Sequence, residues 1–456
     1  CTPFTLARAY AKQLHTPATC ENIDELGKSR VRKDLRGEYR VGSRSDDMRK
    51  GRSMTQQYDV ASVRGLYTGL SDGWTYLNAH AAPQIAERVA SGVARSFRTS
   101  ATVKPQEDTV GAHSARRAPG ELLADDMYSS ARRAVADLTG ATADRVILGP
   151  SLPVLYQSLA AALRPLVRRQ SSVVLSRLDP PELSRAFAHL DADIRWAQPD
   201  LGTGELPAFQ YAELVDGSTR FVAFPAAHEL LGTVTPTADI IDAVHERSRA
   251  WALVDVSSVA PYRRIEFDSV GADILGVDLG KLGGPQLAAL VFRDTAMFRR
   301  LDDLVVGPVS PGLAGGVGPL ADHLAALAGG ERGSRRVRLG RSLDALSSYM
   351  EELCGDLYSL LGTLPAVHIL GVTGEAAADA SDDRLPRLTF AVRDVPADVI
   401  HRRLFDNGLV TTTAPHTPLL TEMGVDEVGG AVTVSLSPFS TYHDIEHLTR
   451  VVASLA

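Results

Sequence analysis

The sequence predicts an α/β fold: a large domain built on a mostly parallel seven-stranded sheet with helices on both faces, followed by a smaller α+β domain. From about Asp59 onward, short β-branched runs alternate with amphipathic stretches of helical period, as they do in βαβ units. Beyond about residue 320 the alternation stops, and one long helical stretch and two further strands follow. The change of rhythm predicts the second domain.

The runs that we predict as strands are rich in apolar and β-branched residues and stop at turn residues. In the large domain they are Arg145–Gly149, Ser172–Ser176, Ile194–Ala197, Arg220–Phe224, Trp251–Asp255, Ile274–Val277 and Ala288–Phe292. Helices are expected between them near 152–167, 180–190 and 237–249, and a sheet of this kind is buried on both faces. In the smaller domain we expect a long helix through 342–362, strands at Arg387–Val392 and Val432–Ser435, and a closing helix near 442–455.

The predicted domains are residues 1–58, 59–320 and 321–456. The first stretch holds many Arg and Lys and shows little apolar periodicity, so we expect a disordered N-terminal extension. An arm that binds nucleic acid or a partner protein is the functional alternative for it. Residues 59–320 are expected to form the large domain and residues 321–456 the small one.

Composition limits the class of protein. Of the 456 residues, 44% are hydrophobic and 23% charged, as is ordinary for a globular protein, and the net charge of −7 argues against general affinity for nucleic acid. Cys1, Cys20 and Cys354 form no disulfide framework, which suits a reducing compartment. No apolar run is long enough to span a membrane, and no signal peptide is evident. We therefore expect a cytoplasmic protein.

Several common motifs are missing from the sequence. It has no GxGxxG after a strand, no GxxxxGK[ST], no HExxH and no GxSxG, which removes the commonest dehydrogenase, NTPase, metalloprotease and hydrolase readings. His443 and His447 lie one helical turn apart, but no third metal ligand is evident, so we expect a solvated helix face.

The stretch from Trp251 to Asp294 contains the most informative pattern. One predicted strand ends on Asp255, the next ends near Asp278, and Lys281 follows just before Gly283-Gly284-Pro285. Ligands of open α/β sheets bind at the carboxyl ends of strands. Enzymes of pyridoxal 5′-phosphate (PLP) need a lysine for the Schiff base and a carboxylate that keeps the pyridine nitrogen protonated. Asp255 and Lys281 have the chemistry for both tasks.

This stretch resembles the aminotransferase class V, fold-type I PLP enzymes, in particular their cysteine desulfurase-like branch. Supporting similarities are WTYLNAHAA at 74–82, LLGTVTP at 230–236 and DNGLV at 406–410. The resemblance implies a PLP-dependent transferase fold of type I, PLP as cofactor, an amino acid substrate and a homodimer. It also implies that Lys281 is the catalytic lysine, that Asp255 binds the pyridine nitrogen, and that Gly149 and Ser151 lie at the phosphate.

The sequence departs from the family pattern around the implied cofactor. Pro180 stands where an aromatic ring stacks on PLP, Glu229 where an Asn binds the ring hydroxyl, and Ser258 where a Gln or His is usual. Asp278 replaces a serine near the phosphate; it either turns away, pairs with Lys281 or weakens phosphate binding. Pro150 removes one N–H donor before Ser151.

Two functional readings remain open. The first is a PLP-dependent enzyme acting on an amino acid by transamination, C–S lysis or epimerisation. It would lack the persulfide-forming Cys of desulfurases, because Cys354 falls within a predicted amphipathic helix. The second is a cofactor-free or non-catalytic relative that keeps the fold for binding or scaffolding.

Overall fold

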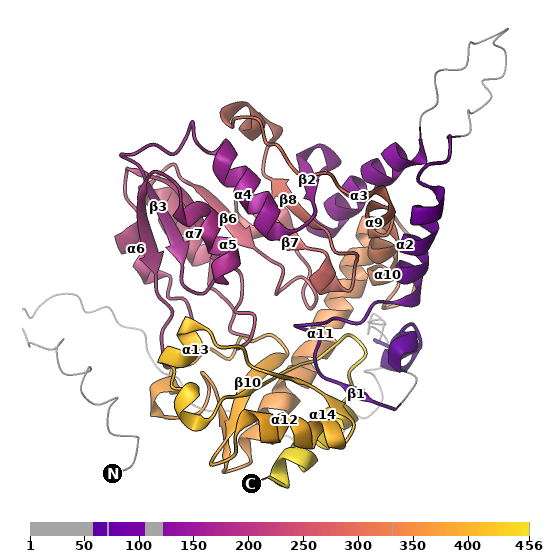
Figure 1. Ribbon diagram of the computed structural model, residues 1–456, viewed down its shortest axis with the longest axis vertical. Coiled ribbons are helices and arrows are strands. Elements are labelled where there is room, and N and C mark those ends of the chain that lie inside the picture. The colour runs from indigo at the N-terminus through magenta and orange to yellow at the C-terminus, as the bar shows by residue number, and fades with distance from the viewer. Residues whose placement is uncertain (1–57, 71–72, 105–121, 331, 456) are drawn as a thin grey trace, which may run out of the picture. The chain divides into compact units, whose positions relative to one another are not determined.

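The computed structural model describes residues 58–70, 73–104, 122–330 and 332–455, which form two main sheets and the helices around them (Figure 1). These described residues belong to one compact unit. Except for Tyr58, the predicted N-terminal extension lies outside them. The boundary predicted at residue 320 stays a prediction.

The larger sheet has the seven strands expected from the sequence, in the order β2-β8-β7-β6-β5-β3-β4. Their bounds are β2 Val146–Gly149, β3 Ser172–Ser176, β4 Asp193–Ala197, β5 Thr219–Pro225, β6 Trp251–Asp255, β7 Ile274–Asp278 and β8 Ala288–Phe292. Strands β4, β3, β5, β6 and β7 pair in parallel, while β8 is antiparallel to both of its neighbours. The mostly parallel seven-stranded sheet is confirmed.

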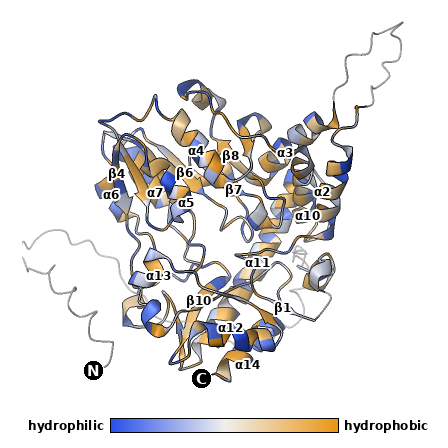
Figure 2. Ribbon diagram, viewed as in Figure 1, coloured by the Kyte–Doolittle hydropathy of each residue, from blue (hydrophilic) through white to orange (hydrophobic). Residues whose placement is uncertain are grey.

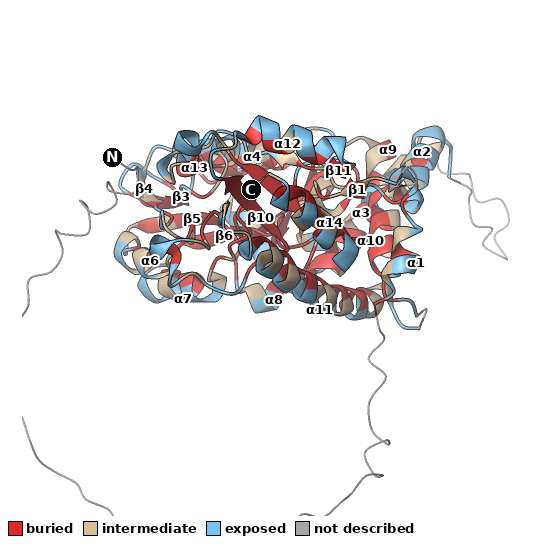
Figure 3. Ribbon diagram, turned by 90° about the horizontal axis from the view of Figure 1, so that it is seen from below, coloured by how far each residue is buried: buried red, intermediate tan, exposed pale blue. Residues whose placement is uncertain are grey.

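Side-chain alternation along the strands fills two cores, one on each face of this sheet. Phe221 and Leu253 join the cluster beneath helices α4 (Leu152–Ala162) and α5 (Pro181–Ala188). The next residue of each strand, Val222 or Val254, joins the cluster on the opposite face, which also holds α3 (Leu123–Thr139) and α7 (Thr237–Arg247). The strands are accordingly rich in apolar residues and buried between the helical layers (Figures 2 and 3).

The smaller sheet is antiparallel and has the order β12-β13-β10-β9. Its strands are β9 Val367–Ile369, β10 Arg387–Val392, β12 Thr412–Thr413 and β13 Val432–Ser435, so the two strands predicted for this region are confirmed. In Figure 1, helix α11 (Arg335–Gly362) runs alongside both the part of the molecule that holds the larger sheet and the part that holds the smaller sheet. The other helices are α1 Val60–Arg64, α2 Glu87–Thr99, α6 Phe209–Leu214, α8 Phe267–Val270, α9 Pro311–Ala314, α10 Val317–Leu324, α12 Ala397–Asp406, α13 Pro418–Glu422 and α14 Tyr442–Ala453.

Two predicted helices differ in length from those observed. Helix α4 ends at Ala162 rather than near residue 167, because Pro165 disfavours helical geometry in the residue before it. Helix α11 begins at Arg335, earlier than predicted, because the Ser334 side chain accepts a hydrogen bond from the Val337 N–H and caps it.

A short two-stranded sheet joins the start of the described chain to its C-terminal part. Strand β1 (Thr75–Tyr76) pairs in parallel with β11 (Leu409–Val410), which brings together two of the segments that carry the family resemblance. Just beyond β1, the His80 N–H donates to Ser435 Oγ at 2.8 Å. Residues 74–82 are thereby fixed to the smaller sheet. Within the described ranges, no helix is long and apolar enough to cross a membrane.

Asp273 ties the beginnings of two central strands together, and we predict that the fold depends on it. Its buried carboxylate accepts the Ala252 N–H at 2.8 Å and contacts Arg293 Nη2 at 2.6 Å and His245 Nε2 at 3.2 Å. Asp273→Ala should lower the free energy of unfolding by about 2 kcal/mol, because a buried N–H loses its acceptor. Urea unfolding measures this change. The exposed Asp268→Ala is the matched control, and equal losses in both variants would contradict the prediction.

Candidate functional site

The carboxyl ends of four parallel strands open into one cavity of about 220 Å³. Its walls come from the segments that follow β3, β5, β6 and β7 and from the start of α4. The lining residues are Leu152, Pro153, Leu178, Asp179, Pro180, Glu182, Leu183, Pro225, Ala227, Glu229, Asp255, Ser257, Ser258, Asp278 and Lys281. Such a position is where α/β sheets bind ligands, because parallel strands end at a common edge.

Asp255 is the last residue of β6 and is 7% exposed. Its Oδ1 accepts the Ser257 N–H at 2.9 Å. Burial raises the pKa of the Asp255 carboxyl to about 6; the Ser257 hydrogen bond works against this shift, whereas the nearby Asp278 adds to it. The carboxyl therefore titrates close to neutrality.

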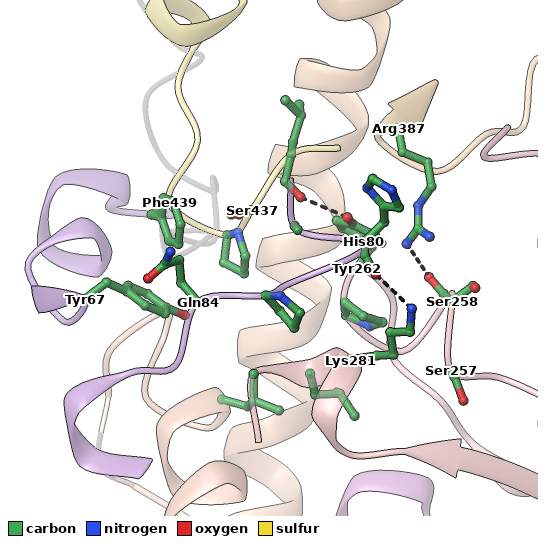
Figure 4. Close-up of a pocket in the computed structure, with 18 residues that line it drawn as sticks. Tyr67, His80, Gln84, Ser257, Ser258, Tyr262, Lys281, Arg387, Ser437 and Phe439 are labelled. Atoms are coloured by element: carbon green, nitrogen blue, oxygen red, sulfur yellow. Dashed lines mark hydrogen bonds between the residues drawn. The ribbon is translucent and has the colours of Figure 1, made fainter. Parts of the chain in front are cut away.

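Lys281 lies in the 3₁₀ turn Gly280–Leu282 between β7 and β8. Its Nζ donates to the His80 carbonyl at 2.8 Å and forms an ion pair with Glu229. The turn can pack against the segment that holds His80 because Gly283 has φ +73°, and a Cβ there would stand 2.7 Å from the Gln84 carbonyl oxygen. Figure 4 shows Lys281 reaching toward His80.

Glu229 is the partner of Lys281 and lies in the loop after β5. Burial alone would raise the pKa of its carboxyl, but the Lys281 ammonium and, behind it, the Arg387 guanidinium outweigh burial and lower that pKa. Glu229 is therefore the ionised member of its ion pair with Lys281.

Two further carboxyls face the cavity without a cation of their own. Burial, with help from Asp255, raises the pKa of Asp179 well above its usual value. Burial also raises the pKa of Asp278, whose Oδ1 accepts the Gly280 N–H at 2.8 Å. Of the alternatives considered for Asp278, pairing with Lys281 is not what the structure shows, because Lys281 Nζ pairs with Glu229. The cavity carries more carboxyls than it can neutralise.

A narrower cavity of about 30 Å³ lies beside Lys281 and shares Ser257 and Ser258 with the first (Figure 4). Arg387 enters it from β10 and is 3% exposed. Its Nη1 and Nη2 donate to the carbonyls of Glu229 and Ser258, both at 2.9 Å, and its Nε has no hydrogen-bond partner. The guanidinium thus fixes the loops that carry Glu229 and Ser258.

The structure brings together four of the residues predicted from the sequence and places two elsewhere. Asp255, Lys281, Glu229 and Ser258 line the same cavity, whereas Gly149 and Ser151 do not. Gly149 ends β2 directly beneath Leu155 of α4, where a Cβ would stand 2.6 Å from that side chain. Ser151 is the residue before α4, and its side chain makes no capping hydrogen bond. The site roles predicted for all six residues stay predictions.

Sequence reasoning missed Asp179, His80 and Arg387. Asp179 could have been found, since it follows the end of β3 at the same edge as Asp255. The other two reach the site from β10 and from the loop after β1, and no local pattern in the sequence predicts those contacts.

The cavity residues match part of PLP only. Asp255 and Lys281 lie on one cavity and suit the pyridine nitrogen and the aldehyde. The phosphate finds no free cation among the described lining residues, and the start of α4, which would bind it, faces Asp278 across the cavity. Pro150 and Pro153 remove two N–H donors at that helix start. Pro180 offers no aromatic ring to stack on the pyridine. These residues therefore do not fit the phosphorylated cofactor.

The described part of the chain offers little for other chemistry. It contains no group of three or more His, Cys, Asp or Glu residues arranged to hold a metal ion. Cys354, the free cysteine among the described residues, is buried in α11, and burial raises the pKa of its thiol to about 12.

Comparisons with known proteins agree on one family. The aminotransferase class-V family model matches residues 109–307. An uncharacterized protein of Mycobacterium tuberculosis is 37% identical over 415 residues, which cover 87% of this chain and 99% of the relative. A cysteine desulfurase from Escherichia coli has a TM-score of 0.69 at 17% identity, covering 87% of this chain and 98% of its own. A second solved structure, in which glycine is covalently linked to the PLP cofactor, has a TM-score of 0.65 at 15% identity, covering 86% and 98% of the two chains. The two structural matches show a shared fold.

The raised pKa of Asp255 predicts that replacing its carboxyl by an amide increases the free energy of unfolding, and that the size of this increase depends on pH. With a pKa of about 6 in the folded protein, against about 3.9 for a free Asp, the folded state holds the proton more tightly, so stability falls as pH rises between those values. Asp255→Asn cannot ionise. At pH 7.5 it should unfold with a free energy up to about 3 kcal/mol higher than the wild type, and the gain should vanish near pH 4. Urea titrations across this pH range test it, with the exposed Asp242→Asn as control; a pH-independent difference would contradict it.

Proposed function

Because this chain belongs to the aminotransferase class V family, in its cysteine desulfurase-like branch with the PLP-dependent fold of type I, we propose that its cavity binds a small molecule carrying a protonated amine and that it does so without PLP. One observation carries the proposal. Five carboxyl side chains line the cavity, and the single lysine among the lining residues is already paired with one of them. An amino acid, the substrate class that the family resemblance predicts, stays the first candidate for the ligand.

The energetics of the carboxyls favour a cationic ligand. Burial raises the pKa values of Asp179, Asp255 and Asp278. In the folded protein, the surrounding groups therefore do not fully offset the cost of burying these carboxylates in their ionised form. A buried charge without a partner costs several kcal/mol. An ammonium group placed among these carboxyls would supply the missing charge and donate up to three hydrogen bonds to their oxygens.

The PLP-dependent enzyme is the second candidate. It is favoured by the presence of Asp255 and Lys281 on one cavity and by the cofactor of the related fold. Transamination, C–S lysis and epimerisation are equally compatible with that pair. A persulfide relay is the least compatible, because the thiol of Cys354 is buried and its raised pKa disfavours the thiolate.

Assembly and location complete the proposal. We propose a homodimer that acts in the cytoplasm. Three exposed apolar side chains, Phe97, Val103 and Leu122, support the dimer: Val103 and Leu122 form a backbone bridge, and Phe97 lies on α2, which leads to Val103. Exposed apolar residues that lie close together mark interaction surfaces.

Binding of a small diamine tests the proposed ligand class. In calorimetric titrations near pH 6, 1,4-diaminobutane and L-lysine should bind, and succinate, a dianion of similar length, should not. Binding should release protons, because an ammonium beside Asp255 favours its ionised form and lowers a pKa that lies near that pH. The heat should therefore depend on the ionisation enthalpy of the buffer.

The controls for this titration are two substitutions on the same cavity. Asp255→Asn should weaken diamine binding by about tenfold or more and reduce the proton release. Glu182→Gln, at an exposed carboxyl on the rim, should change it less. Succinate binding as tight as that of the diamine would sink the proposal. Incubation of the wild type with PLP decides between the candidates: formation of an imine absorbance band that is lost in Lys281→Ala would establish the second candidate instead.

If the proposed dimer uses this apolar surface, a charged residue placed there should weaken the association of the two chains. Analytical ultracentrifugation of the wild type should give twice the mass of one chain. Phe97→Glu should shift the population toward monomer, because a carboxylate is costly in an apolar interface. Val428→Glu is the matched control, since Val428 is a similarly exposed apolar residue at 49% exposure in a different part of the chain. A monomeric wild type would overturn the proposed dimer.

A further inference from the structure

We infer that two side chains, Glu229 and Asp278, keep PLP out of this cavity, and that neutralising them lets Lys281 bond to the cofactor's aldehyde. The inference rests on the proposed cofactor-free function and adds the residues that determine it. Glu229 acts on the amine through its ion pair with Lys281, and Asp278 acts on an anion that would bind at the start of α4.

Glu229 is held in place from several sides. Its carbonyl accepts Arg387 Nη1, and the following Leu230 and Leu231 N–H groups donate to His228 Nδ1. The residue after Leu231, Gly232, has φ +75°, and a Cβ there would stand 2.5 Å from the Arg387 carbonyl oxygen, so the loop packs closely on β10. The Glu229 carboxylate therefore faces Lys281 as a fixed group, and the ion pair is a built feature of the site.

Asp278 adds a second carboxyl to the same cavity. It ends β7 and lines the cavity together with Leu152 and Pro153, the first two residues of α4. An anion at that helix start would therefore share the cavity with the Asp278 carboxyl. Like charges held a few ångströms apart in a partly buried site repel strongly. Neutral Asn at position 278 removes the repulsion and can still accept the Gly280 N–H that now bonds to Oδ1.

The bond between Lys281 and an aldehyde, an imine, shows how Glu229 would interfere with the cofactor. Bond formation would release the extra proton of the Lys281 ammonium to solvent; the amine nitrogen would then add to the aldehyde carbon, its two remaining hydrogens would leave with the carbonyl oxygen as water, and a C=N bond would replace the C=O bond. The Glu229 carboxylate holds this amine in an ion pair, and the step has to break that contact. Glu229→Gln removes the ion pair while retaining the size of the side chain.

The experiment compares PLP with pyridoxal, the same aldehyde without its phosphate, on the wild type, Glu229→Gln, Asp278→Asn and the double variant. Imine formation is followed by absorbance, and borohydride reduction followed by peptide mass spectrometry locates the bond on Lys281. The double variant should reach half-saturation with PLP at a concentration at least about tenfold below that of the wild type. Asp278→Asn should help PLP more than pyridoxal, because only PLP carries the phosphate that the carboxylate repels, whereas Glu229→Gln should help both alike.

Three controls make the outcome decisive. Asp242→Asn removes an exposed carboxyl on α7, outside the cavity lining, and should leave both ligands unchanged. Lys281→Ala in the double variant should abolish the band. Circular dichroism and urea unfolding establish that each variant is folded. If the folded double variant forms no imine, the inference is overturned while the cofactor-free function stands. If the wild type forms the imine as readily as the double variant, both are overturned.

Discussion

The site depends on one geometric constraint: strands β3, β5, β6 and β7 run in parallel, so their carboxyl ends lie along the same edge of the sheet. Residues far apart in the sequence, such as Asp179, Asp255 and Asp278, are brought to one cavity for that reason. The strands are held in register by a core buried on both faces, which leaves the strand ends as the place where polar groups gather. The fold thus concentrates carboxyls where a ligand would bind.

Concentrating carboxyls works against stability, and the rest of the molecule has to offset that cost. The large buried cores on the two faces of the sheet supply hydrophobic stabilisation. Protons supply part of the remainder, since burial raises the pKa values of Asp179, Asp255 and Asp278 and keeps their charge low. Among the cavity carboxyls, Glu229 is the one paired with a lysine, Lys281.

The large sheet could be predicted from sequence because its strands are buried runs with clear turn residues at their ends, as Ser172–Ser176 and Trp251–Asp255 illustrate. Asp255 and Lys281 were singled out on the same ground, since Asp255 ends one strand and Lys281 closely follows the end of the next. The pairing of Lys281 with Glu229 was not, because it depends on how a loop after β5 packs on β10. Arg387 was missed because nothing in the sequence around it indicates that this side chain is buried and donates to two loop carbonyls.

The pairing of β1 with β11 also bears on how the molecule forms during synthesis. Thr75 pairs with Leu409, so a segment made early must wait for one made more than 300 residues later. Contacts between such distant segments form slowly, because a long loop has to close first. The His80 carbonyl reaches Lys281 only from this segment. A nascent chain can therefore assemble its large sheet and the lining of the larger cavity first, whereas the narrower cavity beside Lys281 gains its walls from His80 and Arg387 only after the β10 segment has been made.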